Sequence, residues 1–258
     1  WLRWGGVKGF VDGSLGSTTA WFHEPYADAP QTRGLQMVES ATLAGLIQSA
    51  DRAGLHVAVH AIGDQANDWL LDTYERIARE DGPRDRRFRI EHAQHLTPAA
   101  IRRFGPLGVA PSMQPYHAID DGRWAEKRIG AEGPKATYAF IALLAAKAPL
   151  TFGSDWPVAP LNPMTGIDAA VTRRTIDGRN PGGWQPQEKI SVAQALGAYT
   201  VANAHAGFQD EKLGRIKVGQ LADFAVLSQD IFSIDPRTIA TVKVLRTVVG
   251  GKDAYVAE

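Results

Sequence analysis

The chain has 258 residues, of which 44% are hydrophobic and 22% charged, a composition typical of a globular protein with a sizeable core rather than of a disordered or fibrous one. Its 28 basic residues balance 28 acidic residues, so no overall field favours nucleic acid or an anionic membrane. The lack of cysteine excludes disulfides, a thiol nucleophile and a thiolate zinc site, and no apolar run approaches the roughly 18 residues of a membrane span.

A short apolar strand is predicted at the start of the chain, over residues 6–13, and it leads into a glycine-rich turn at residues 12–17. Lys8 lies within this strand, where burial of an ammonium group is costly unless the group is paired or neutral. The turn lacks the spacing and the Lys-Ser/Thr ending of a P-loop, which argues against a phosphate site. Residues 21–36 are predicted to form a long surface loop.

Strands and helices then alternate regularly. The predicted order is a helix from the N-cap Ser40 to Gly54, a strand at 55–59, a helix at 65–79, a strand at 88–91, a helix at 97–105 and a strand at 108–111. This order indicates a parallel sheet built from right-handed βαβ units. The basic cluster at 84–87 is interrupted by an acid, and we interpret it as a solvated loop before a strand.

The second half of the chain is less regular. Residues 112–135 are polar and are predicted to be irregular, followed by a helix at 136–146, a strand at 150–152, a helix around 167–171 and helices at 192–200 and 201–206. From Gly214 onward, short strands separated by Gly and Asp indicate a small β unit. We therefore predict a (β/α) barrel portion over residues 1–210 and a C-terminal β-sandwich segment over residues 211–258.

Three predicted strands end in residues that can bind a metal. His60 and His92 end the second and third apolar strand patterns, and Asp155 follows the strand at 150–152. Side chains at the carboxyl ends of parallel strands gather at one face, so these residues predict one metal site. Imidazole and carboxylate suit zinc, manganese or iron(II), which acidify a bound water, and Asp155 would then accept its proton.

Each of these residues also has a structural interpretation. A lone histidine at a strand end is more often a hydrogen-bonded structural residue, and an Asp before Trp-Pro can simply cap a turn. His56 and His95 are predicted to be satisfied or exposed histidines. Glu91 either orients the neighbouring His92 or forms a buried ion pair, and both alternatives stay open.

Four phrases carry a resemblance to a known family. They are Val-Lys-Gly-Phe-Val-Asp-Gly-Ser-Leu-Gly-Ser at 7–17, His-Ala-Ile-Gly-Asp at 60–64, Arg-Ile-Glu-His-Ala-Gln at 89–94 and Phe-Gly-Ser-Asp-Trp-Pro-Val at 152–158. In this order and spacing they resemble the amidohydrolase superfamily, specifically its YtcJ-like branch, amidohydrolase family 3, which includes N-substituted formamide deformylase. The tail at 213–224 and 249–252 is similar to the stretch by which such enzymes close their β-sandwich domain.

The resemblance implies an α/β fold, a (β/α)8 TIM barrel of the metal-dependent hydrolase type, with a small β-sandwich segment at the C-terminus. Lys8 would be the strand-four lysine, carboxylated by CO2 so that its carbamate bridges two metals. A buried neutral amine is what that reaction needs. Amidohydrolases begin their barrel with a His-x-His pair, which this sequence lacks. We therefore expect only strands four to eight here, as a fragment of a longer enzyme. A complete polypeptide would need another chain to cover its sheet edges.

The other site residues follow from the same resemblance. His60 and His92 would be the metal ligands from strands five and six, and Asp155, from strand eight, would bind metal and act as the general base. Gln114 and His117, in a phrase similar to the family's Gln-Pro-x-His, would face the substrate, with a purely structural loop as the alternative.

The predicted function is a metal-dependent amidohydrolase that cleaves a carbon–nitrogen bond in an amide, formamide or cyclic imide. One or two divalent ions are expected, with zinc as the expected metal. One alternative is an inactive fragment or scaffold without a complete metal site, and another is a sugar-phosphate barrel enzyme that binds phosphate at residues 13–17. We expect a small-molecule substrate, no nucleic-acid or membrane partner and a cytoplasmic location, and we leave homo-oligomerisation open.

Overall fold

The computed structural model describes residues 5–258. They divide into two compact units. The first unit contains the chain up to Met113 together with Asp121–Leu150, and the second contains Gln114–Asp120 together with Thr151–Glu258. This division concerns compactness alone, and the domain boundary expected near residue 210 stays a prediction.

The first unit is built on parallel strands that pair in chain order, as the alternating pattern predicts. The strands are β1 (Val7–Phe10), β2 (Val57–Ala61), β3 (Arg89–His92) and β4 (Ala110–Met113), and the connecting helices are α1 (Ser40–Arg52), α2 (Asp64–Glu80) and α3 (Pro98–Leu107). All five residues of β2 are buried, because this strand pairs with a neighbour on each side and its side chains are covered on both faces.

The helices of this unit follow the expected patterns with two differences at their ends. On α2, Leu70, Tyr74 and Ile77 recur at helical spacing and are buried. The N-cap of α1 is Glu39, whose carboxylate accepts hydrogen bonds from the backbone of residues 41 and 42, so the prediction of Ser40 was wrong. Helix α3 runs two residues beyond its predicted end, to Leu107, because Gly108 adopts the left-handed conformation that ends it, with φ of 62°.

The prediction of irregular structure over residues 112–135 was wrong. After the last residues of β4, this stretch contains α4 (Pro115–Asp121), α5 (Ala125–Ile129) and the start of the 3-10 turn η1 (Gly133–Ala136). These helices lack a clear hydrophobic period in the sequence, because each is short and buries only a few small or apolar residues, such as Ala118 and Ala125. Helix α6 (Phe140–Ala145) follows in the same half of the chain.

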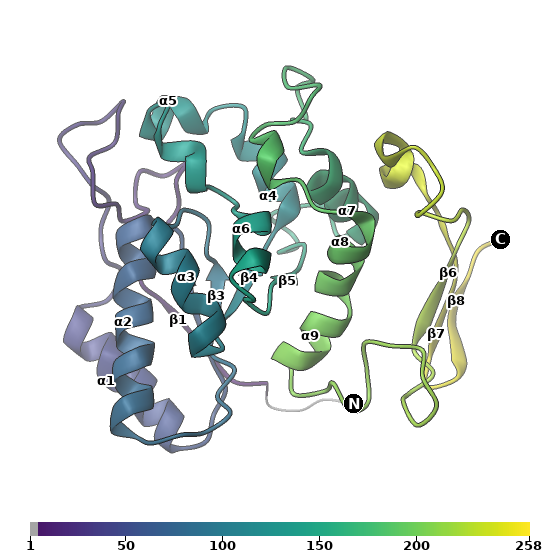
Figure 1. Cartoon of the computed structure of the whole chain (residues 1–258), viewed down its shortest axis with the longest axis horizontal. Coiled ribbons are helices and arrows are strands. Elements are labelled where there is room, and N and C mark those ends of the chain that lie inside the picture. Colours follow the sequence, from purple (N-terminus) through teal and green to yellow (C-terminus); the bar gives the residue numbers. More distant parts are fainter. Residues whose placement is uncertain (1–4) are drawn as a thin grey trace. The chain divides into compact units, whose positions relative to one another are not determined.

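The second unit combines a short strand, several helices and an antiparallel sheet at the C-terminus (Figure 1). Its elements are β5 (Thr151–Phe152), α7 (Pro163–Thr172), the turn η2 (Pro186–Glu188), α8 (Val192–Tyr199), α9 (Val201–Ala206), β6 (Phe224–Leu227), the turn η3 (Pro236–Thr241), β7 (Val244–Val249) and β8 (Lys252–Val256). Strands β6, β7 and β8 pair antiparallel and form the predicted small β unit. The chain is therefore α/β, with a parallel sheet and a small antiparallel sheet.

Local contacts stabilise the helices of the second unit. Ser191 and Gln194 form a reciprocal capping box at the start of α8. The turn η3 packs against α7, and the Arg174 guanidinium donates a hydrogen bond of 3.1 Å to the carbonyl of Arg237. Across residues 5–258, no helix combines the length and the apolar character that a membrane crossing requires.

Candidate metal site

Two of the predicted ligands, His60 and His92, lie together in the first unit. Both side chains are buried, and their ring centroids are 4.5 Å apart. In the register of β2 and β3, His60 lies beside Glu91, so regular alternation would turn the next side chain, His92, to the other face. His92 instead has φ of +76°, and the following Ala93 has φ of +45°. This break in the strand accounts for a ring that lies next to His60.

The hydrogen bonds of His60 define its tautomer. Its Nε2 lies 2.8 Å from the carbonyl oxygen of Gly13 and 3.5 Å from Oδ1 of Asp12. A carbonyl oxygen only accepts, so Nε2 carries a proton, and in the neutral form of the ring the lone pair is then on Nδ1. The ring also packs against Phe10, with centroids 5.2 Å apart. His60 is thus held in one orientation, with Nδ1 as the nitrogen that could bind a metal.

Asp12, which we did not single out in the sequence, is a fully buried carboxylate beside this histidine. It accepts backbone hydrogen bonds from Trp21 at 2.8 Å, Ile62 at 3.0 Å and Gly63 at 2.8 Å. Burial raises the pKa of Asp12 to about 7, although the backbone donors act to lower it. Its only signal in the sequence is its position between an apolar strand and a glycine turn.

Lys8 does not occupy the buried position that we expected. It is exposed, and its Nζ lies 4.8 Å from the centroid of the Phe10 ring. Strand β1 stands first in the strand order, hydrogen-bonded to β2, and its residues alternate between half-buried and exposed. Lys8 is two residues from Phe10, which pairs with His60, so all three belong to one face of the sheet. Its expected role as a ligand stays a prediction.

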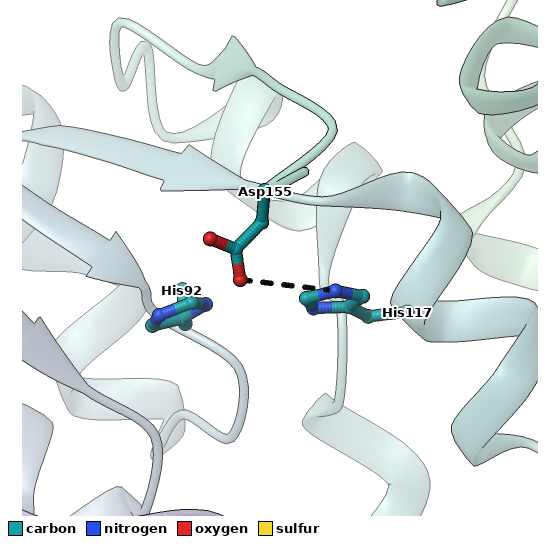
Figure 2. A group of neighbouring side chains, drawn as sticks. All are labelled: His92, His117 and Asp155. Carbon is teal, nitrogen blue, oxygen red and sulfur yellow. Dashed lines mark ion pairs between the residues drawn. The ribbon is translucent and has the colours of Figure 1, made fainter. Parts of the chain in front are cut away.

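In the second unit the structure brings His117 and Asp155 together. Nε2 of His117 lies 3.9 Å from Oδ2 of Asp155, the pair joined by the dashed line in Figure 2, which also labels His92. This distance is too long for a direct hydrogen bond. Both atoms can still reach one ion, because zinc binds nitrogen and oxygen at roughly 2.0–2.2 Å and the two bonds together span more than this distance. His117, which we assigned to substrate contact, is therefore also of metal-ligand type.

The local backbone conformation determines where the side chains of His117 and Asp155 lie. Asp155 follows β5 in the left-handed region, with φ of +59°. His117 lies in the first turn of α4, where its backbone N–H donates to the carbonyl of Gln114 at 3.1 Å. Burial lowers the pKa of His117, an effect that the charge of Asp155 opposes. The imidazole is therefore kept neutral, as a ligand or hydrogen-bonding group requires. Gln114 is buried just before α4, and its predicted contact with substrate stays a prediction.

The remaining histidines have hydrogen-bond partners, as expected. Nε2 of His56 lies 2.7 Å from the carbonyl of Arg87, and Nδ1 of His95 lies 2.8 Å from the hydroxyl of Thr137. Full burial lowers the pKa of His95 to about 3. For Glu91, the structure contains the ion-pair alternative, since Arg89 donates to its carboxylate at 2.7 Å.

The basic cluster is less solvated than we expected. Arg84 and Arg86 both bind Asp51, which is 1% exposed, and the side chain of Arg86 is itself only 7% exposed. Two guanidinium groups thus pair with one buried carboxylate, which explains why these arginines fold back on the protein. The interpretation as a solvated loop was wrong for Arg86.

Comparison with known proteins identifies the class. The fold matches a crystal structure of an uncharacterized metal-dependent hydrolase from Pyrococcus horikoshii, with a TM-score of 0.80 and 33% identity over 89% of this chain and 45% of that one. The profile of the amidohydrolase family matches residues 1–255, and the chain belongs to this family.

Two relatives refine the assignment. Protein LONG AFTER FAR-RED 3 of Arabidopsis thaliana is 48% identical over 259 residues, covering 99% of this chain and 43% of that protein. Putative amidohydrolase YtcJ of Bacillus subtilis is 35% identical over 255 residues, covering 99% and 48%. The predicted YtcJ-like branch is confirmed. The chain spans about half the length of these relatives.

Proposed function

We propose that this protein is a metal-dependent amidohydrolase that hydrolyses a carbon–nitrogen bond in a small amide, formamide or cyclic imide. The observation that carries the proposal is the presence of two ligand-type pairs, His60 with His92 and His117 with Asp155, in a chain that matches the amidohydrolase family over residues 1–255.

The proposed ligands are Lys8, as its carbamate, together with His60, His92 and Asp155. The donor set fits a divalent ion of the zinc type, since it combines neutral imidazoles with a carboxylate. One or two such ions, with zinc expected, would supply a Lewis acid that lowers the pKa of water toward neutrality.

The side chains of the chain would handle the protons. Asp155 accepts a proton from the attacking water and delivers it to the nitrogen of the leaving group. Its side chain is 39% exposed, which leaves it accessible to water and substrate. His117, kept neutral by burial, and Gln114 bind the carbonyl or amide of the substrate by hydrogen bonds. His60 and His92 serve only to hold the ion, because they are buried.

One observation favours the second candidate, an inactive scaffold. Lys8 is exposed rather than held in an apolar site, whereas the carbamate was expected to form on a buried amine. Proteolysis and mass spectrometry under CO2, together with metal analysis, would separate a carboxylated lysine from a free one.

The experiment that tests the proposed function is metal analysis of the purified protein followed by hydrolysis assays on a panel of amides, formamides and cyclic imides. Activity should be lost after chelation and restored by zinc. The control variant is His205→Ala, which should keep its metal content and its activity. His205 and Asp210 also lie 3.9 Å apart, but they are on the surface near the end of α9. Full activity after complete metal removal would contradict the proposal.

A further inference from the structure

The buried carboxylate of Asp12 joins three segments of the first unit. Asp12 follows β1, and its donors are the backbone N–H groups of Trp21, in the long loop, and of Ile62 and Gly63, in the turn after β2. A carboxylate with no exposed surface is costly to bury, and charge-assisted hydrogen bonds of 2.8–3.0 Å offset that cost.

The segments around Asp12 are packed too closely to move independently. A Cβ atom at Gly63 would lie 2.0 Å from the carbonyl oxygen of Trp21, so only glycine fits there. The same carbonyl accepts a hydrogen bond from the backbone of Ala66 at 3.2 Å. The loop therefore lies directly on the turn that follows His60, and the Asp12 carboxyl group is hydrogen-bonded to both of them.

The Nε2 atom of His60 lies next to Asp12 and Gly13. Its proton is donated to the carbonyl of Gly13 at 2.8 Å, and Oδ1 of Asp12 lies 3.5 Å from the same nitrogen. A carboxylate beside one ring nitrogen favours the tautomer with the proton on that nitrogen and stabilises the orientation of the ring. Both oxygens of Asp12 are also held by the backbone, so the carboxylate cannot turn away.

We propose that Asp12 is a positioning residue for the metal site, which fixes His60 as its Nε2–H tautomer and so presents the lone pair of Nδ1 to an ion. The tautomer does not depend on the proposed function, whereas the binding of an ion does. Asp12 acts through His60 and through the turn at Gly63, and it does not contact the ion itself.

The first test needs no substitution. Nitrogen-15 NMR of the metal-free protein, above the ordinary histidine pKa of about 6.5, distinguishes a protonated from an unprotonated Nε2. His60→Gln assigns the signal. We expect the Nε2–H tautomer, and an Nδ1–H tautomer would overturn the proposal whether or not the protein binds metal.

The second test uses Asp12→Asn, which keeps the shape but replaces one acceptor oxygen with an NH2 group. We expect a mixture of His60 tautomers and a loss of zinc affinity of about 10–100-fold, the usual effect of removing a partner of a metal-binding histidine, measured by chelator competition. Tyr26→Phe is the control, since the Tyr26 hydroxyl tethers the same loop through a hydrogen bond of 2.9 Å to the carbonyl of Ala20. The proposal would be overturned if both variants lost zinc affinity equally, or if the His60 tautomer were unchanged in Asp12→Asn. Asp12 would then serve only to pack the loop. If the unsubstituted protein binds no zinc, the proposed function fails, while the tautomer results still decide the role of Asp12.

Discussion

The two pairs of ligand-type residues differ in how firmly they are held. His60 and His92 in the first unit are buried, their rings meet edge to face, and His60 is hydrogen-bonded to the carbonyl of Gly13 in the loop after β1. His117 and Asp155 in the second unit are more exposed and 3.9 Å apart, without a direct hydrogen bond. A ligand that only binds an ion benefits from rigidity, whereas a group that exchanges protons needs access to water and substrate. Within the proposed function, His60 and His92 would be the holding pair, and His117 and Asp155 the reacting pair.

The largest effect should come from the reacting pair. Asp155→Asn removes the proposed general base while keeping the size of the side chain, so kcat should fall about 10²–10⁴-fold, as measured in steady-state assays. Asp210→Asn, at the exposed His205–Asp210 pair, should leave kcat unchanged. Retention of activity in Asp155→Asn would end the assignment of distinct roles to the two pairs.

Substitution in the holding pair should act on the ion instead. His92→Ala should weaken zinc binding by more than the roughly 10–100-fold that is typical for loss of an outer partner, because a direct ligand is removed. Isothermal titration with zinc measures the effect. If His92→Ala had normal zinc affinity but a reduced kcat, His92 would belong to the reacting pair, and the two pairs would not have separate roles.

The free energy of unfolding should depend on pH through His95, which lies in the first unit. Its pKa is about 3 in the folded protein and roughly 6.5 when unfolded, so the unfolded state binds the extra proton between these values. The buried neutral imidazole therefore stabilises the fold above pH 6.5. This contribution should decline by about 1.4 kcal/mol for each pH unit below that value. Urea unfolding at pH 7 and pH 5 tests this, with His95→Gln as a control whose stability should vary less; equal slopes would show that His95 is not the group responsible.

The smallest effects concern two matched helix caps, one in each unit. The Thr97 hydroxyl caps α3 in the first unit, and Ser191 caps α8 in the second. Thr97→Ala and Ser191→Ala should each lower the free energy of unfolding by about 1 kcal/mol. Thermal unfolding shows whether both shift a single transition. Separate transitions, each moved by one variant alone, would show that the two units differ in stability as well as in their pairs.

Part of the fold could be read directly from local patterns. The apolar run from Val57 to Val59, followed by His60, predicted a buried parallel strand with a functional end, and the structure contains it. Helices α3 and α8 begin where the sequence predicts them, with Thr97 and Ser191 as their caps. These features depend on neighbours in sequence, so local propensity and hydrophobic period suffice to find them.

Other features could not be found in this way. The sequence locates Asp12 only at the end of a strand, because its partners lie 9, 50 and 51 residues away. The pairing of His117 with Asp155 joins residues from α4 and from the loop after β5, and α4 itself was missed in a polar stretch. Lys8 was expected in the core because its neighbours in sequence are apolar, but exposure is set by the elements that cover a strand.

The amino-acid sequence alone therefore determined the family, the alternation of strands and helices, and the residues at the strand ends. Only the tertiary structure decided which nitrogen of His60 carries a proton, that Asp12 joins three segments, and that His117 accompanies Asp155. The physical reason is that strand and helix signals act over a few residues, whereas protonation states and ligand pairs depend on atoms brought together from distant parts of the chain.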